Sequence, residues 1–140
     1  MYTHKHIGID FKTVESVGQL EPHHQKLVLK AREAAWKAYA PYSKFYVGAA
    51  VELDNGEIVL GSNKENASFP AGICAERNAL NYVSDHFPDQ KIVRIAVTAN
   101  PQEFTLSEPV SPCGVCRQVM AEYERVQKQP FEILLTAQKG

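Results

Sequence analysis

The chain has 140 residues, of which 44% are hydrophobic and 22% charged, and this is the composition of one folded domain. Its net charge of −1 excludes the broad basic face of a general nucleic-acid-binding protein. Residues 1–10 lack the apolar core of a signal peptide, and no apolar run reaches membrane-spanning length. We therefore expect a cytoplasmic protein that binds neither nucleic acid nor membrane.

The chain is expected to consist of an N-terminal extension, residues 1–21, and one domain, residues 22–140. Apolar residues alternate with other residues from Ile7 to Phe11, and this period of two predicts a short strand. A helix is predicted from Pro22 to Tyr39, because small and apolar residues recur at helical spacing and Pro22 suits a first turn. Pro41 is expected to stop this helix.

A β-hairpin follows the first helix. Val47–Leu53 and Glu57–Gly61 are predicted strands, and the turn Asp54–Gly56 between them is a strong hairpin signal. A loop then leads to a second predicted helix over Cys74–Asp85, with an apolar stripe of Ala75, Ala79, Leu80 and Val83. The β-branched run Lys91–Ala99 is typical of a buried third strand.

The last third of the chain predicts one more helix and one more strand. Ser111 as N-cap and Pro112 at the first helical position predict a helix start, and the helix extends to about Gln127. Its apolar stripe is expected to be Val115, Val119, Tyr123 and Val126. Phe131–Thr136 is the fourth predicted strand. Helices that alternate with the later strands imply an α/β fold, a mixed β-sheet covered by helices.

Three cysteines carry the clearest chemical signal. An odd count does not suit a disulfide framework and favours metal or redox chemistry. Cys113 and Cys116 begin one predicted helix and Cys74 begins another, and helix N-termini favour thiolates. If the two N-termini meet, three thiolates leave one position of a tetrahedral zinc ion open, which is the pattern of a catalytic site. The alternative is that Cys113 and Cys116 form a redox dithiol.

Charged residues flank these cysteines. Glu76 follows Cys74 by two residues, and a carboxylate near a metal-bound water can take its proton and return it elsewhere. Arg77 follows Glu76 and Arg117 follows Cys116, and either arginine is expected to donate to the sulfurs and draw off negative charge. The alternative for each arginine is an ordinary surface position.

Four segments resemble the free-nucleoside cytidine deaminases, and the resemblance extends over about Ala31 to Thr136. The segments are Tyr42–Ala50, Asn63–Phe69, Cys74–Arg77 and Ser111–Val119. The resemblance implies a three-layer α/β/α fold and one zinc ion per chain. It also implies hydrolysis of cytidine or deoxycytidine to uridine or deoxyuridine and ammonia, a step of pyrimidine salvage.

The resemblance assigns roles to individual residues. Cys74, Cys113 and Cys116 match the zinc ligands, and Glu76 matches the proton-shuttling glutamate. Asn63 and Glu65 match the pair that grips the ribose 3′-hydroxyl, and Phe45 matches the ring that packs against the pyrimidine. The resemblance also implies a homo-oligomer, commonly a tetramer, in which Phe69 lies near a neighbouring subunit's site. Phe69 stands where family members commonly have tyrosine.

The residue type of the first zinc ligand indicates the class of substrate. A C-x-E sequence such as Cys74–Glu76 is typical of the nucleoside enzymes, whereas the nucleotide enzymes usually begin with H-x-E. Two alternatives are a deaminase of another aminated pyrimidine nucleoside and a non-catalytic zinc or redox protein. Family chains usually continue past the last strand, whereas this sequence stops at Gly140, so a true end there predicts a more open pocket and an open strand edge.

Overall fold

The computed structural model describes residues 1–138, and residues 139–140, including the predicted domain end at Gly140, lie outside the described residues. The main elements are α1 (Pro22–Ala35), β1 (Phe45–Leu53), β2 (Ile58–Ser62), α2 (Ala75–His86), β3 (Ile92–Pro101), α3 (Gly114–Gln127) and β4 (Glu132–Thr136). Two short 3₁₀ turns, η1 (Val17–Gln19) and η2 (Phe69–Ala71), precede α1 and α2. Among the described residues, no helix is both long and apolar enough to cross a membrane.

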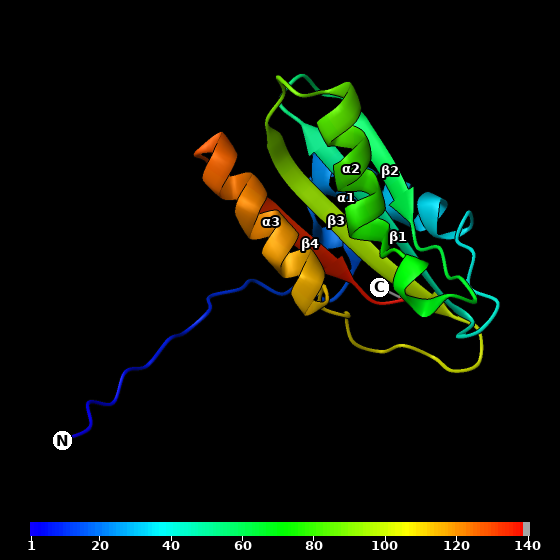
Figure 1. Cartoon of the computed structure of the whole chain (residues 1–140), viewed down its shortest axis with the longest axis horizontal. Helices are drawn as coiled ribbons and strands as arrows, with labels where there is room; N and C mark the ends of the chain where they lie inside the picture. Colours follow the sequence, from blue (N-terminus) through cyan, green and yellow to red (C-terminus); the bar gives the residue numbers. More distant parts are fainter. Residues whose placement is uncertain (139–140) are drawn as a thin grey trace.

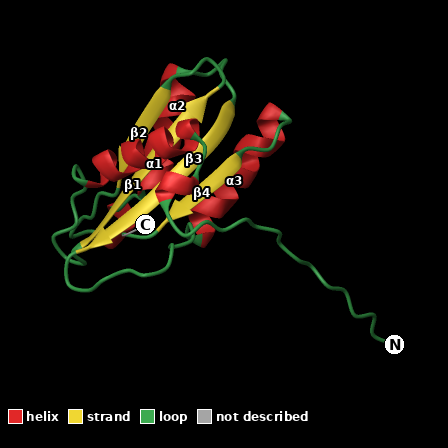
Figure 2. Cartoon of the chain, turned by 180° about the vertical axis from the view of Figure 1, so that it is seen from behind, coloured by secondary structure: helices red, strands yellow, loops and turns green. Residues whose placement is uncertain are grey.

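The four strands form one mixed sheet in the order β2-β1-β3-β4. The β1 strand pairs antiparallel with both β2 and β3, whereas β3 and β4 are parallel. Figure 1 shows α2 and α3 on one face of this sheet, and Figure 2 shows α1 on the opposite face. The predicted mixed sheet covered by helices in three layers is therefore confirmed.

Each face of the sheet has its own apolar core. Alternate residues of β1 point to opposite faces, so Ala50 packs with Leu27 and Ala31 of α1, whereas Ala49 packs with the α2 and α3 side. On that second side the α2 stripe predicted from the sequence is fully buried, and it comprises Ala75, Ala79, Leu80 and Val83. Both helical layers are therefore held by burial of apolar surface against the sheet.

Two glycines let the helices approach the sheet closely. A Cβ atom at Gly48 of β1 would lie 1.9 Å from the carbonyl oxygen of Ala31 in α1. A Cβ atom at Gly61 of β2 would lie 2.3 Å from the carbonyl oxygen of Ala75 in α2. No real Cβ tolerates such contacts with backbone, so these two positions set the spacing of the layers.

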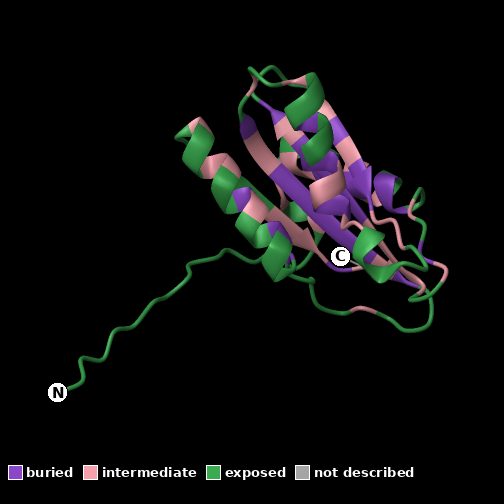
Figure 3. Cartoon of the chain, in the orientation of Figure 1, coloured by how far each residue is buried: buried purple, intermediate pink, exposed green. Residues whose placement is uncertain are grey.

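The strand predicted over Ile7–Phe11 is not formed. Residues 1–13 have no regular structure and extend away from the body of the molecule (Figure 3), and the Phe11 side chain is 81% exposed. Alternation alone is not sufficient for a strand, because an isolated strand leaves its backbone groups without partners in a ladder.

The first helix ends at Ala35, four residues before the predicted end at Tyr39. Lys37 and Ala38 donate to carbonyls three residues back, which tightens the last turn. Tyr39 then donates to the Asn63 carbonyl at 2.9 Å. Pairing with a distant segment therefore takes the place of further helix, and the helix ends six residues before Pro41.

The third helix also differs from prediction. Cys113, not Ser111, is its N-cap, and the Cys113 sulfur accepts a hydrogen bond from the Cys116 amide at 3.4 Å. The predicted stripe is partly wrong, because Val115 and Val126 are 57% and 66% exposed. The buried positions are Cys116 and Met120, with Val119 and Tyr123 packed against the core. The buried face of α3 is therefore turned away from the predicted stripe, and Cys116 faces α2.

Candidate active site

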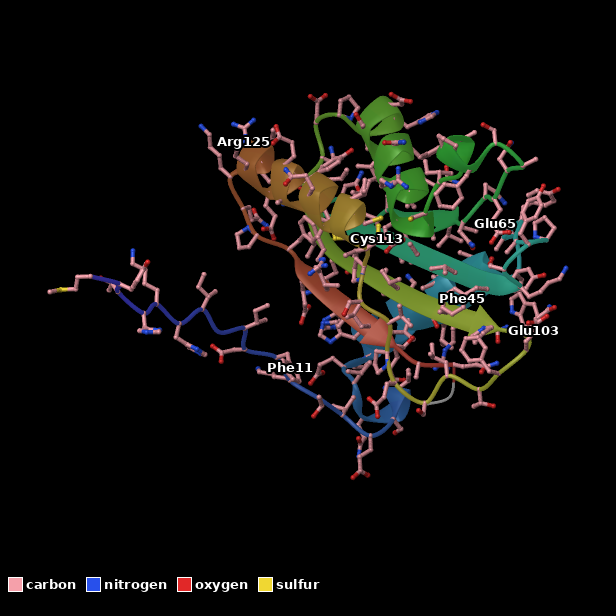
Figure 4. The ribbon with its side chains drawn as sticks, turned by 60° about the horizontal axis from the view of Figure 1, so that its bottom comes forward. Phe11, Phe45, Glu65, Glu103, Cys113 and Arg125 are labelled. Carbon is pink, nitrogen blue, oxygen red and sulfur yellow. The ribbon has the colours of Figure 1, made fainter. Side chains whose placement is uncertain are left out.

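Three cysteine sulfurs meet where the N-termini of α2 and α3 come together. Cys74 is the N-cap of α2, Cys113 is the N-cap of α3, and Cys116 lies in the first turn of α3. All three sulfurs lie within 4.8 Å of one another, and those of Cys74 and Cys113 are 3.8 Å apart. We call Cys74, Cys113 and Cys116 the cysteine cluster. Figure 4 shows Cys113 at one end of α3 and Arg125 at the other end.

The geometry and chemistry of the cysteine cluster fit a zinc ion. Zinc–sulfur bonds are about 2.3 Å long, so two sulfurs of a tetrahedral site lie about 3.8 Å apart. The cluster within residues 1–138 comprises these three ligands, which leaves a fourth position for water or substrate. Burial increases from Cys113, which is exposed, through Cys74 to Cys116, which is fully buried. A metal held by them would therefore be open to solvent on the Cys113 side.

The surroundings of Cys74 favour its thiolate. Hydrogen bonds from Cys116, Arg77 and Cys113 lower the pKa of the Cys74 thiol to about 5, with that from Cys116 the largest cause. The same hydrogen bond and burial raise the pKa of the Cys116 thiol, because Cys116 keeps its proton while it donates to the Cys74 thiolate. Electrostatics thus already stabilise negative charge at this point without a metal.

Arg77 is in contact with the cluster. Its Nη2 lies 3.5 Å from the Cys74 sulfur, and hydrogen bonds first to Cys74 and then to Cys116 raise the pKa of the guanidinium. The structure therefore brings Arg77 to the position expected of a donor to the sulfurs. Arg117 is exposed, as the surface alternative for it predicts.

Glu76 lies in the first turn of α2, next to the cluster. Its residue is only 5% exposed, yet it lines the cavity described below. Burial raises the pKa of the Glu76 carboxyl, and the negative charge of Cys74 acts in the same direction. A carboxyl group with a raised pKa can both take and return a proton near neutral pH.

A cavity of about 920 Å³ opens in front of the cluster. Its wall combines residues of the β1 and β3 strands, the loop after β2 and the start of α2. The predicted site residues in this wall are Phe45, Asn63, Glu65, Phe69, Cys74, Glu76, Arg77 and Cys113. Cys116 is fully buried and does not line the cavity. The structure therefore gathers the residues singled out by the sequence around one space large enough for a nucleoside-sized ligand.

The far side of the cavity is held by side chain–backbone hydrogen bonds. The Asn63 amide accepts from the Val47 amide at 2.8 Å and donates to the Phe45 carbonyl at 2.9 Å. The Glu65 carboxylate accepts from the Tyr42 amide at 2.9 Å and from the Ser43 hydroxyl. We call Ser43, Phe45, Asn63 and Glu65 the turn network. Figure 4 shows Glu65 and Phe45 on the same side of the molecule, with Phe11 far from both.

Phe69 differs from the other wall residues. It begins η2 at the cavity rim and is 92% exposed, so it covers little of the cavity of its own chain. Phe45, by contrast, is half-buried and lies against Phe104, with ring centroids 6.2 Å apart.

Sequence reasoning missed some wall residues. The hydroxyl of Ser43 donates to Glu65, and the only signal for this contact in the sequence is that serine hydroxyls in turns often form side-chain hydrogen bonds. Thr98 of β3 and Val110 of the loop before α3 also line the cavity. Thr98 and Val110 reach the cavity wall only through the strand pairing and the path of the loop, and no local pattern in the sequence predicts these positions.

Comparison with known proteins gives a consistent result. Residues 21–132 match the model of the cytidine and deoxycytidylate deaminase zinc-binding region. A cytidine deaminase of Halalkalibacterium halodurans is 45% identical over 98 residues, 70% of either chain. One from Sporosarcina psychrophila is 44% identical over 100 residues, 71% of this chain and 68% of that one. The crystal structure of a Burkholderia pseudomallei cytidine deaminase superimposes with a TM-score of 0.70 at 37% identity, over 86% of this chain and 88% of the other.

Proposed function

The chain belongs to the cytidine and deoxycytidylate deaminase family, and from that premise we propose that it is a zinc-dependent cytidine deaminase. It hydrolyses cytidine or deoxycytidine to uridine or deoxyuridine and ammonia, as a step of pyrimidine salvage. The observation that carries this proposal is that three cysteine sulfurs converge beside the cavity whose wall contains the buried Glu76 residue. A redox dithiol would need neither a third sulfur nor a buried carboxylate.

Cys74, Cys113 and Cys116 hold the zinc ion, and Arg77 donates to the Cys74 sulfur to offset part of the negative charge of three thiolates. When bound, zinc supplies a Lewis acid that lowers the pKa of water. Glu76 takes one proton from the attacking water and delivers it to the ring nitrogen, and it then takes the second proton of the same oxygen and delivers it to the departing amine. Its burial supports this role, because burial raises the pKa of the carboxyl and so makes the carboxylate a stronger base toward the water proton.

The turn network binds the nucleoside. Phe45 packs against the pyrimidine ring, and Asn63 and Glu65 bind the 3′-hydroxyl of the sugar. The amide of Asn63 retains one N–H beyond its bond to Phe45, and this N–H can donate to the sugar oxygen. A carboxylate in this wall disfavours a phosphate group beside it, so the substrate is an uncharged nucleoside.

The active form is a homo-oligomer, with a tetramer favoured. Phe69 supports this because an aromatic ring that is 92% exposed at a cavity rim is suited to cover the site of a neighbouring subunit. We assign residues 22–140 to the deaminase domain and residues 1–21 to an extension, and the family match over residues 21–132 supports this division. Three cysteines that act as thiolates suit a reducing compartment, so we place the enzyme in the cytoplasm.

The test uses the purified chain with its zinc content measured. We expect one zinc per chain and conversion of cytidine to uridine and ammonia, followed by the fall in cytidine absorbance. A chelator is expected to abolish the conversion, and added zinc to restore it. Deoxycytidine, deoxycytidylate and other aminated pyrimidine nucleosides in the same assay define the substrate. A zinc-loaded chain that converts neither cytidine nor deoxycytidine would overturn the proposal, and turnover of another nucleoside would replace the substrate named here.

A further inference from the structure

The turn between α1 and β1 wraps around the Glu65 carboxylate. The backbone amides of Tyr42 and Ser43 donate to Glu65 Oε2 at 2.9 and 3.3 Å, and the Ser43 hydroxyl donates to Oε1. The turn is closed by Lys44, which has a left-handed φ of 54° and donates to the Ala40 carbonyl at 3.0 Å. A single carboxylate therefore receives three donors from two consecutive residues.

The Ser43 hydroxyl has a second partner. It accepts a hydrogen bond from the Phe45 amide at 3.1 Å while it donates to Glu65. One oxygen atom thus connects the residue proposed to bind the sugar with the first residue of β1, the proposed wall of the base pocket. Removal of this oxygen would release both connections, whereas the two amide bonds to Oε2 would remain.

Three donors leave little freedom at Glu65. A carboxylate offers about four lone-pair sites, so the turn leaves about one for a ligand, and the position of Ser43 decides where that site points. The backbone of Glu65 is fixed separately, because its amide donates to the Tyr39 carbonyl at 2.7 Å. Hydrogen bonds from Ser43, and then from the Tyr42 and Ser43 amides, lower the pKa of the Glu65 carboxyl, so it is ionised when it meets substrate.

We propose that Ser43 is a positioning residue for the sugar: its hydroxyl orients the Glu65 carboxylate toward the 3′-hydroxyl of the nucleoside and takes no part in the chemical step. This inference rests on the proposed function. Ser43 acts on ground-state and transition-state binding alike, because the sugar does not change during deamination. Its loss therefore raises KM and leaves kcat unchanged.

The test is the Ser43→Ala variant with a matched pair of substrates, deoxycytidine and 2′,3′-dideoxycytidine, which differ only in the 3′-hydroxyl. For deoxycytidine we expect KM to rise about fivefold, the cost of one net hydrogen bond, with kcat within about twofold of wild type. For the dideoxy substrate, which lacks the hydroxyl that Glu65 binds, we expect a smaller loss of kcat/KM than for deoxycytidine, because only the released Phe45 amide affects it. Ser43→Thr keeps the hydroxyl and is expected to restore KM. Zinc content and melting temperature establish that both variants are folded.

Each result of this test supports or overturns the assignment of Ser43 as a positioning residue. An equal loss on both substrates would show a structural role for Ser43, and a fall in kcat would show a part in the chemistry; either overturns the inference. An unchanged KM, or a threonine variant that fails to restore it, also overturns the inference. These results all require a wild-type chain that deaminates deoxycytidine. A zinc-loaded wild-type chain that deaminates neither deoxycytidine nor cytidine overturns the proposed function instead.

Discussion

The cysteine cluster is built on two helix N-termini, whereas the turn network on the other side of the cavity is built on a loop, a turn and the start of a strand. Helices that pack against the sheet hold the cluster, and Cys74 and Cys116 are largely removed from water. The turn network is held by hydrogen bonds between side chains and backbone, and Ser43 and its bonds to Glu65 are exposed.

This difference separates two kinds of effect. A change in the cysteine cluster removes chemistry and packing together, because the metal would connect two helices of the core. A change in the turn network alters how the substrate is held, because water can replace a lost exposed hydrogen bond at small cost. Variants at the two sites are therefore expected to differ in both size and kinetic signature.

The largest effect is expected for Cys113→Ala, which removes one zinc ligand. We expect loss of bound zinc, loss of detectable turnover and a lower melting temperature. The upper guide for stability is about 10 kcal/mol, the scale of zinc binding in small zinc domains. Metal analysis, activity and thermal unfolding check this. Val115→Ala in the same turn, at an exposed site, is the control and should change stability by less than about 0.5 kcal/mol. Stoichiometric zinc in Cys113→Ala would show that Cys113 is not a ligand.

Glu76→Gln is expected to keep zinc and fold but to lower kcat by about 10²–10⁴-fold or more, because the amide accepts no proton. Steady-state kinetics with a zinc assay separate this variant from Cys113→Ala. Glu57→Gln, at an exposed carboxylate in the hairpin, provides the comparison and should match wild type. A Glu76→Gln enzyme within tenfold of the wild-type rate would remove Glu76 from the mechanism.

Arg77→Met is expected to weaken zinc affinity or activity about 10- to 100-fold, the usual cost of losing a donor to a metal ligand. Competition with a chelator measures the affinity. Arg117→Met is a matched control, since Arg117 also follows a cysteine of the cluster but is exposed. Equal effects of the two substitutions would mean that net charge near the cluster, and not contact with Cys74, matters.

The smallest effect is expected at the turn network. Glu65→Gln should raise KM for deoxycytidine about tenfold with kcat little changed, because the lost interaction stabilises the ground state and the transition state equally. Glu103→Gln, an exposed residue in the loop after β3, should leave both constants unchanged. A large fall in kcat for Glu65→Gln would show that the two sides of the cavity are coupled in the chemical step, contrary to the comparison above.

The sequence was most informative where spacing alone decides the structure. The α2 stripe was predicted correctly because an α-helix imposes its period on the chain, and the hairpin between β1 and β2 because the Asp54–Gly56 turn suits it. Helix positions alone make the convergence of Cys74 with Cys113 conditional on a meeting of the two helix N-termini, and only the family resemblance predicts it outright. No local pattern says that two helix N-termini meet, and the order β2-β1-β3-β4 is what brings them together.

The errors share a physical cause. The helix predicted to Tyr39 ends at Ala35 because Tyr39 pairs with Asn63, and the α3 stripe is shifted because Cys116 turns inward toward α2. In both cases a long-range contact outweighs a local preference. The contact of Ser43 with Glu65 is of the same kind, because it joins residues 22 positions apart.

Gly61 of β2 links the packing of the sheet to the position of the active-site residues at the start of α2. Its Cα faces the Ala75 carbonyl, and Ala75 lies between Cys74 and Glu76 in the chain. An added methyl group would displace the start of α2, and the proposed zinc ligand Cys74 and the proposed proton carrier Glu76 would move with it. In a mutational scan, position 61 should therefore tolerate substitution as poorly as the active-site residues do, although it lies outside the cavity wall. Gene libraries that aim to alter substrate choice should keep this codon fixed and vary the cavity rim.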